Sequence, residues 1–340
     1  MHEASVVVDR EGYRDAVTPW EDEGWRRAAV DWARRQLSTR GTPVSGPLRV
    51  RLRPWSVLVR IPVAPAGGCG GAAWFKANPP ASAFEAGLGQ ALAAWVPRHV
   101  LRPIAVDAAR GWSLLPEGGT LWRTVLDGGP ADARAWEEPL RQYASMQRAL
   151  LPHVRRLREL GVPDARAAAL PGLYDRLVDG AEGVTDEERA ELRALRPRLA
   201  DWCRELAATG VPDSLDHSDL HEGQILVPRP GRFTFFDWGD ATVAHPFTSL
   251  LVTSRMAARR FGAEVLPRLR DAYLEPWTGE GLGGAELRRA AGLACRLGAV
   301  GRACAWGRLF PGPQGAAGAE AAAARVRWLR RLFDESSPHR

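Results

Sequence analysis

Lysine is nearly absent from this sequence. Among the 46 basic residues of the 340-residue chain, Lys76 is the single lysine and every other one is an arginine. A coding preference for arginine accounts for that background, but it does not account for the exception. An ammonium group is a compact point charge that fits against phosphate oxygens, whereas the planar arginine fork is larger and aimed differently. We therefore expect a chemical role for Lys76, with chance survival on the surface as the alternative.

Cysteine is also scarce, and long apolar runs are missing. The four cysteines are scattered without a CxxC pair, so neither a zinc site nor a disulfide framework is predicted. No apolar run approaches the roughly 18 residues that a membrane span needs. The first twenty residues are mixed and polar and do not have the pattern of a signal peptide. We expect a cytoplasmic protein without a membrane partner.

A basic stripe is absent as well, although the formal net charge is +6. The arginines are dispersed among acidic residues in most helical segments, so nucleic acid is not an expected partner. A chain of 340 residues with 45% hydrophobic content can bury a sizeable core. Its length fits two or three domains or one large two-lobed unit.

The first third of the chain predicts a helix followed by a small sheet. Thr18-Pro19-Trp20-Glu21 has the pattern of a capping box and opens a helix to about Arg40. Alternating apolar and polar residues then predict a three-stranded antiparallel meander and two further strands, over residues 48–53, 56–62, 72–77, 100–106 and 111–115.

Three turns and a second helix interrupt or end this sheet. The glycine-rich segment 66–71 lacks the phosphate-loop pattern and stands before a strand, so we predict a flexible hairpin loop. Ser82-Ala-Phe-Glu85 has the pattern of a second capping box, opening a helix to about Trp95. Pro116-Glu-Gly-Gly119 predicts a hinge-like turn after the last strand.

The rest of the chain is predicted to be mainly helical, with the exception of residues 214–240. The expected helices cover residues 131–150, 154–160, 186–208, 246–260, 262–274, 284–307 and 316–334. Two short strands in the exceptional segment frame a proline-glycine turn. The predicted class is α+β: a small antiparallel sheet lobe over 1–115, a hinge at 116–119, and a larger helical lobe over 120–340.

Several residues fit the requirements of phosphoryl transfer, which needs a cation on the phosphates, magnesium ligands and a carboxylate near the attacking hydroxyl. Lys76 closes the third strand of the meander, and Glu85 either pairs with it or serves only as a capping residue. Asp219 is followed five residues later by Gln224, whose amide oxygen suits a metal ion. Asp237 ends the next strand, and a hairpin of this length brings it back to Gln224.

The motifs resemble those of the aminoglycoside phosphotransferases and their protein-kinase-like relatives. The resemblance rests on His-Ser-Asp-Leu-His-Glu-Gly-Gln-Ile-Leu at 217–226, Phe-Phe-Asp-Trp-Gly-Asp-Ala at 235–241 and Trp-Phe-Lys-Ala at 74–77. It spans roughly residues 50–305 and implies a protein-kinase-like, two-lobed fold.

The resemblance also implies roles for single residues. Asp219 would be the catalytic base, and Asp237 and Gln224 would bind Mg²⁺. The nucleotide would be contacted by the side chains or backbone of Lys76, Glu85 and Ser56, which follows Trp55, and of the hinge residues Leu115 and Glu117. The sequence departs from the family pattern in having Gln224 where asparagine is usual, and in lacking a glycine at the turn Arg53-Pro-Trp-Ser56.

The remaining polar residues around these motifs are expected to have structural roles. His217 and His221 flank Asp219, but no partner stands at zinc spacing, so we expect them to support the loop by hydrogen bonds. Asp240 and His245 are expected to anchor the loop after Asp237 and to begin the next helix.

The function expected is transfer of the γ-phosphoryl group of ATP or GTP to a hydroxyl of a small molecule, plausibly an antibiotic or related natural product. A non-catalytic, kinase-like nucleotide-binding module is the alternative. A protein kinase is disfavoured, because Pro246 comes only nine positions after Asp237, which leaves little room for an activation segment. The basic chain suits polycationic aminoglycosides only if Asp216, Asp271 and Glu275 form an acidic rim.

Overall fold

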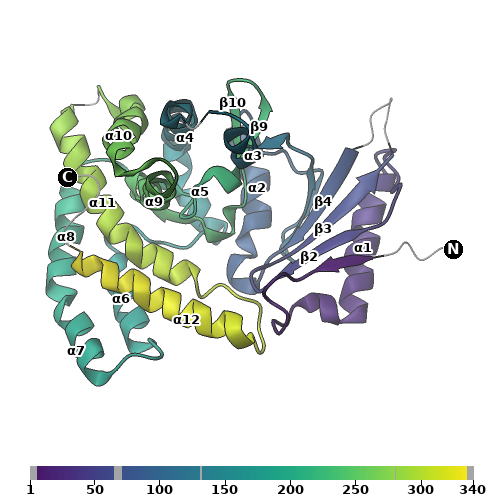
Figure 1. Cartoon of the computed structure of the whole chain (residues 1–340), viewed down its shortest axis with the longest axis horizontal. Helices are drawn as coiled ribbons and strands as arrows, with labels where there is room; N and C mark the ends of the chain where they lie inside the picture. The colour runs from purple at the N-terminus through teal and green to yellow at the C-terminus, as the bar shows by residue number, and fades with distance from the viewer. Residues whose placement is uncertain (1–5, 65–70, 131, 280, 335–340) are drawn as a thin grey trace. The chain divides into compact units, whose positions relative to one another are not determined.

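The computed structural model describes residues 6–64, 71–130, 132–279 and 281–334 (Figure 1). The predicted glycine-rich loop therefore lies outside the described residues, except for Gly71. The chain divides into two compact units, and residues 1–97, 101–118 and 308–321 form the first. The second comprises residues 98–100, 119–307 and 322–340. The helical lobe predicted from the sequence covers everything after residue 119. The contacts between residues instead group 308–321 with the unit that contains the sheet.

A six-stranded sheet forms the centre of the first unit. Its strand order is β1-β2-β3-β4-β6-β5. The strands are β1 (Val7–Asp9), β2 (Arg49–Arg53), β3 (Ser56–Val63), β4 (Gly71–Ala77), β5 (Ala105–Asp107) and β6 (Trp112–Pro116). The prediction of a purely antiparallel sheet is wrong at one edge, because β1 pairs with β2 in parallel. A strand of three residues is too short to show a readable alternation, and the sequence analysis missed it.

Helix α1 (Glu23–Ser38) packs against this sheet and closes an aromatic core (Figure 1). The predicted capping box is present: the Thr18 side chain and Glu21 bond reciprocally at the short 3-10 turn that leads into the helix. Trp32 lies against Phe75 of β4, with ring centroids 6.0 Å apart, and Phe75 lies 5.5 Å from Trp112 of β6. Burial of these large rings fixes the face of the sheet that α1 covers.

The second predicted capping box is wrong. Helix α2 (Phe84–Trp95) ends where expected, but Ala83 occupies its N-cap and makes no side-chain bond there. Ser82 belongs to a short 3-10 turn, and the Glu85 carboxylate bonds to Lys76. A buried ammonium group is a stronger hydrogen-bond donor to a carboxylate than a neutral backbone amide.

The second unit is mainly helical. Its helices are α3 (Trp122–Asp127), α4 (Glu137–Leu150), α5 (Val154–Glu159), α6 (Leu170–Asp179), α7 (Asp186–Ala194), α8 (Arg196–Ala208), α9 (Leu250–Phe261), α10 (Leu266–Leu274) and α11 (Gly284–Ala305). The boundary between the units falls inside α12 (Gly315–Arg330). None of the described helices has the length and apolar character of a membrane span.

Two small sheets complete the second unit. One has the order β10-β9-β7, from Arg232–Phe235, Ile225–Arg229 and Thr120–Leu121, and the other pairs β8 (Ser214–Asp216) with β11 (Thr242–Ala244). The strands β8 and β11 and the helices α3 and α6 were not predicted. Helix α6 opens with Leu-Pro-Gly, a breaker pattern that is tolerated because proline stands in the first turn. Proline in the first turn of α8 likewise splits the predicted helix 186–208 in two.

Candidate functional site

Asp219 lies in a loop whose shape is fixed by a neighbouring buried carboxylate. Asp216, at the end of β8, accepts hydrogen bonds from the Ser218 backbone N–H (3.1 Å) and from the Ser218 hydroxyl (2.7 Å). It also accepts one from the Ser249 hydroxyl (2.6 Å). Ser218 has φ +61°, a left-handed conformation that costs free energy for a residue with a Cβ. The bonds to Asp216 offset that cost and direct Asp219 out of the turn.

His217 connects this loop to the segment that carries Asp237. Its Nε2 donates to the Phe236 carbonyl oxygen at 2.8 Å, and its ring packs against Trp238 at a centroid distance of 4.7 Å. His217 is fully buried. The expected role in supporting the loop is confirmed, and the contact sets the spacing between the two motifs.

His221 has a similar supporting role on the other side of Asp219. Its Nδ1 accepts a hydrogen bond from the Gly223 backbone N–H at 2.9 Å, so a neutral ring carries its proton on Nε2. That Nε2 lies 3.7 Å from Oδ2 of Asp219. Within the residues that the structure describes, no group of three histidine, cysteine, aspartate or glutamate side chains could hold a metal ion. The hydrogen bond that His221 accepts from Gly223 is the loop support predicted for it.

Gln224 and Asp237 stand together at the open end of the β9–β10 hairpin. Ile225 pairs with Phe235, and the Phe236 N–H donates to the Gln224 carbonyl oxygen at 3.2 Å. Asp237 has φ +67°. Only three described residues other than glycine have positive φ, and both Asp237 and Ser218 are among them. Backbone strain of this kind concentrates at functional sites.

The donor set at this hairpin end suits magnesium. Mg²⁺ is commonly held by one or two carboxylates together with substrate phosphates and waters, and it does not require a complete protein cage. Asp237 supplies one carboxylate and Gln224 one amide oxygen. Both residues are half-buried. The pair therefore fits a hard cation that arrives with a nucleotide.

Asp219 itself is held by an arginine that the sequence analysis did not find. Nη2 of Arg302, on α11, lies 2.7 Å from Oδ1 of Asp219. Burial by itself would raise the pKa of Asp219, but the Arg302 charge and His221 lower it below its usual value. The carboxylate is therefore ionised at neutral pH, as a general base must be. Arg302 lies 83 residues after Asp219, and nothing in its local sequence marks it.

The segment after Asp237 is anchored as expected. Asp240 forms an ion pair with the Arg302 Nη1 atom. His245 is fully buried and accepts a hydrogen bond from the Phe247 N–H through Nδ1 at 3.3 Å, at the start of the turn that leads into α9. Burial lowers the pKa of His245 to about 3. The ring is neutral, and its role is the structural one predicted.

In the first unit, Lys76 and Glu85 form a buried ion pair. The Lys76 Nζ lies 2.7 Å from both carboxylate oxygens of Glu85. Their side chains are 7% and 8% exposed. Asn78, which the sequence analysis did not consider, donates to the same carboxylate and to the Ser82 carbonyl oxygen. Lys76 is thus a core residue with its charge in a fixed position, and chance survival on the surface is excluded.

The other predicted nucleotide contacts lie in the same unit. Ser56 begins β3 and is buried, while Trp55 in the preceding two-residue turn is 41% exposed. Leu115 belongs to β6, opposite Trp74. Glu117 follows that strand and lies 3.7 Å from Arg60 in an exposed ion pair.

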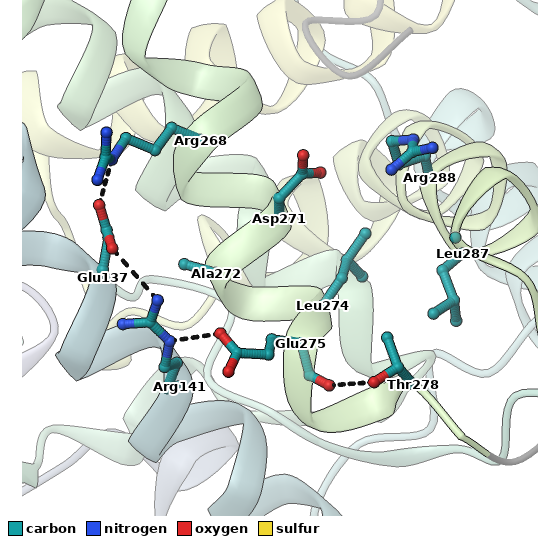
Figure 2. Close-up of a pocket in the computed structure, with 11 residues that line it drawn as sticks. Glu137, Arg141, Arg268, Asp271, Ala272, Leu274, Glu275, Thr278, Leu287 and Arg288 are labelled. Carbon is teal, nitrogen blue, oxygen red and sulfur yellow. Dashed lines mark hydrogen bonds and ion pairs between the residues drawn. The ribbon is translucent and has the colours of Figure 1, made fainter.

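A pocket of about 470 Å³ lies elsewhere in the second unit, between α4, α10 and the start of α11 (Figure 2). Its charged lining is balanced, with the acids Glu137, Asp271 and Glu275 and the bases Arg141, Arg268 and Arg288. Arg141 bonds to Glu275 at 2.6 Å and to Glu137 at 3.2 Å (Figure 2). The pocket is therefore not an acidic site.

The expected acidic rim does not form as predicted. Asp271 and Glu275 line the charged pocket, but Asp216 is buried and bonded to its own loop. Arg288 at the pocket stands 14 residues before Arg302 on the straight run of α11, which is about 21 Å at 1.5 Å per residue. The pocket is accordingly separate from the loop that carries Asp219.

Comparison with known proteins identifies the fold and the family. Among solved structures, a GDP and kanamycin complex of APH(2")-IIia matches with a TM-score of 0.56 at 14% identity, over 90% of this chain and 97% of that one. Macrolide 2'-phosphotransferase MphH from Brachybacterium faecium matches with a TM-score of 0.53 at 18% identity, over 91% and 99%. An ethanolamine kinase of Plasmodium vivax matches with a TM-score of 0.57 at 10% identity, over 83% and 82%.

These structural matches define a protein-kinase-like fold, as predicted. Comparison with curated protein sequences gives no match. The sequence profile of the phosphotransferase enzyme family (APH) matches residues 33–293, which is more than half of the chain. The protein belongs to this family and is a small-molecule kinase.

Proposed function

We propose that the protein transfers the γ-phosphoryl group of ATP or GTP to a hydroxyl group of a small molecule, with Asp219 as the base. The observation that carries this proposal is the arrangement around Asp219. An ionised carboxylate stands in a rigid loop, and that loop is bonded through His217 to the hairpin end with Gln224 and Asp237.

The chain's own residues have separable tasks in this reaction. Asp219 orients the acceptor hydroxyl and takes its proton. Lys76, held by Glu85, contacts the nucleotide phosphates, and Ser56, Leu115 and Glu117 contribute the other nucleotide contacts. Asp237 and Gln224 would hold Mg²⁺, which neutralises charge on the phosphates when bound. The longer glutamine in place of asparagine keeps the amide oxygen and moves it by one methylene.

The nature of the acceptor follows from the family and from the charge of the chain. Proteins of similar fold include a GDP and kanamycin complex of an aminoglycoside-type phosphotransferase, APH(2")-IIia, a macrolide 2'-phosphotransferase and an ethanolamine kinase. This chain has a formal charge of +6, and the pocket between α4, α10 and α11 is lined by as many basic as acidic side chains. A neutral or weakly charged hydroxyl compound, such as a macrolide-like antibiotic or a natural-product intermediate, therefore fits better than a polycation. A cytoplasmic location fits this reaction, because the cytoplasm supplies nucleoside triphosphates.

A panel experiment tests the proposal. Purified protein is incubated with Mg²⁺ and either ATP or GTP together with macrolides, aminoglycosides, amino alcohols and sugars, and mass spectrometry detects a gain of one phosphoryl group. The same panel without Mg²⁺ is the control. A phosphorylated product that requires Mg²⁺ supports the proposal. Nucleotide binding without turnover on any acceptor would instead favour a binding module.

A further inference from the structure

Arg302 holds two carboxylates that belong to two different loops. Its Nη2 contacts Asp219 in the loop after β8, and its Nη1 contacts Asp240 in the turn after Asp237. The planar guanidinium presents these two nitrogens in a fixed geometry, which a lysine ammonium does not offer. Arg302 therefore fixes the catalytic loop relative to the segment that carries Asp237.

Stability alone does not explain an arginine at this position. The Arg302 side chain is only 12% exposed, and its Nε is buried without a hydrogen-bond partner in the described part of the chain. Buried ion networks are often no more stabilising than apolar residues of similar volume, because desolvation offsets the attraction. On the face of α11 that carries Arg302, the residues three positions away, Ala299 and Ala305, are small, apolar and buried. Arg302 is the charged exception on this face, and its contact with Asp219 points to a role there.

The contact also distinguishes the two oxygens of Asp219. Oδ1 is bonded to Arg302, whereas Oδ2 lies 3.7 Å from the His221 Nε2, beyond hydrogen-bond distance. Oδ2 is accordingly the oxygen that can accept a proton from a hydroxyl in the site. A partial rotation of the carboxylate away from this orientation would break the bond to Arg302.

We propose that Arg302 is a positioning residue for phosphoryl transfer, which holds Oδ1 of Asp219 so that Oδ2 faces the acceptor hydroxyl. This inference rests on the proposed function. In the step, the acceptor O–H bond breaks and its proton moves to Oδ2. The acceptor oxygen forms a bond to the γ-phosphorus, and the bond from that phosphorus to the β,γ-bridging oxygen breaks, so that the nucleoside diphosphate leaves with the electron pair.

Replacement of Arg302 tests the inference through kcat. A misplacement of about 1 Å in a catalytic group costs roughly 100-fold in rate, so Arg302→Met should lower kcat by about that factor and leave the nucleotide KM unchanged. Arg302→Lys keeps the charge but reaches only one carboxylate. Its kcat should therefore lie between those of the wild type and Arg302→Met. Addition of millimolar guanidinium to Arg302→Ala should restore part of kcat, and urea at the same concentration should not.

A matched control and a double variant separate positioning from packing. Arg296 lies on the same helix, with its guanidinium 4.6 Å from the Trp202 ring, and Arg296→Met should keep the wild-type kcat. In a background of Asp219→Asn, Arg302→Met should cause no further loss, because the carboxylate that Arg302 is proposed to position is absent. Thermal unfolding of each variant shows whether it is folded. Should Arg302→Met not fold, Asp240→Asn and Arg302→Lys carry the test.

The assay uses the acceptor found in the panel or, if none is found, hydrolysis of MgATP and MgGTP. Normal kcat in folded Arg302→Met, together with an inactive Asp219→Asn, would overturn this inference and leave the proposed function intact. Additive losses in the double variant would overturn it too. A wild-type protein with neither transfer nor hydrolysis would overturn the proposed function and the inference with it.

Discussion

The buried pair of Lys76 and Glu85 allows stability and nucleotide binding to be separated by mutation. Each side chain is less than a tenth exposed, and the Nζ atom lies 2.7 Å from both carboxylate oxygens. Lys76→Met removes the cation and leaves the carboxylate in the core. Breaking a buried pair in this way typically costs about 3–5 kcal/mol. The amide of Asn78 still donates to Glu85, so we expect the lower end of that range.

The double variant Lys76→Met/Glu85→Leu should recover most of that stability. Removal of both charges eliminates the desolvation penalty, and apolar replacements of buried pairs are often neutral. Nucleotide affinity should not recover, because the phosphate contact is still missing. A charged hydrogen bond is worth about 1.5–3 kcal/mol, which corresponds to a Kd roughly 10- to 150-fold weaker.

Urea unfolding and titration with a fluorescent nucleotide measure the two quantities in the same preparations. Arg60→Met is the control in the same sheet, because its exposed pair with Glu117 is worth less than about 1 kcal/mol. A double variant as unstable as Lys76→Met would refute the reasoning on stability. Wild-type nucleotide affinity in the double variant would refute the phosphate contact.

Two further predictions concern pH. The pKa of His245 is about 3 in the folded state and near 6.5 unfolded, so the unfolded chain binds the extra proton and stability falls as pH drops below 6.5. Between pH 7 and pH 5 this loss is about 2 kcal/mol by urea unfolding, and His245→Asn, which keeps an N-cap, should remove it. Because the pKa of Asp219 is below its usual 3.8, the kcat/KM of a folded enzyme should not decline from Asp219 protonation above pH 5, and Arg302→Met should move that acid limb upward. If stability falls between pH 7 and pH 5 as steeply in His245→Asn as in the wild type, the first prediction is wrong. If the acid limb of kcat/KM is the same in Arg302→Met as in the wild type, the second is wrong.

The arrangement of the motif in the second unit could be predicted because the motif is local. Asp219 and Gln224 share one loop, and the hairpin that follows has a fixed length, so its register returns Asp237 to Gln224. Lys76 stood out because it is the only lysine. Its pairing with Glu85 was one of two alternatives, and the choice depended on a sheet and a helix packing together, which spacing alone does not decide.

The features that the sequence did not reveal depend on distant contacts. Arg302 resembles dozens of other arginines in the chain, and only the packing of α11 brings it to Asp219. Asp216 was a candidate for an acidic rim because the sequence gives its charge. The sequence does not give its burial or its hydrogen bonds to Ser218, which come from the fold. Strands β1, β8 and β11 have three residues each and gain their pairing from neighbours, so no periodicity marks them.

Replacement of the proposed base tests the central claim most directly. With the acceptor identified in the panel and saturating nucleotide, kcat is measured for the wild type and for Asp219→Asn, and nucleotide Kd is measured for both. We predict a kcat lower by about 10²- to 10⁴-fold with an unchanged Kd, since the amide cannot take the hydroxyl proton. A kcat equal to that of the wild type would contradict the assignment of Asp219 as the base.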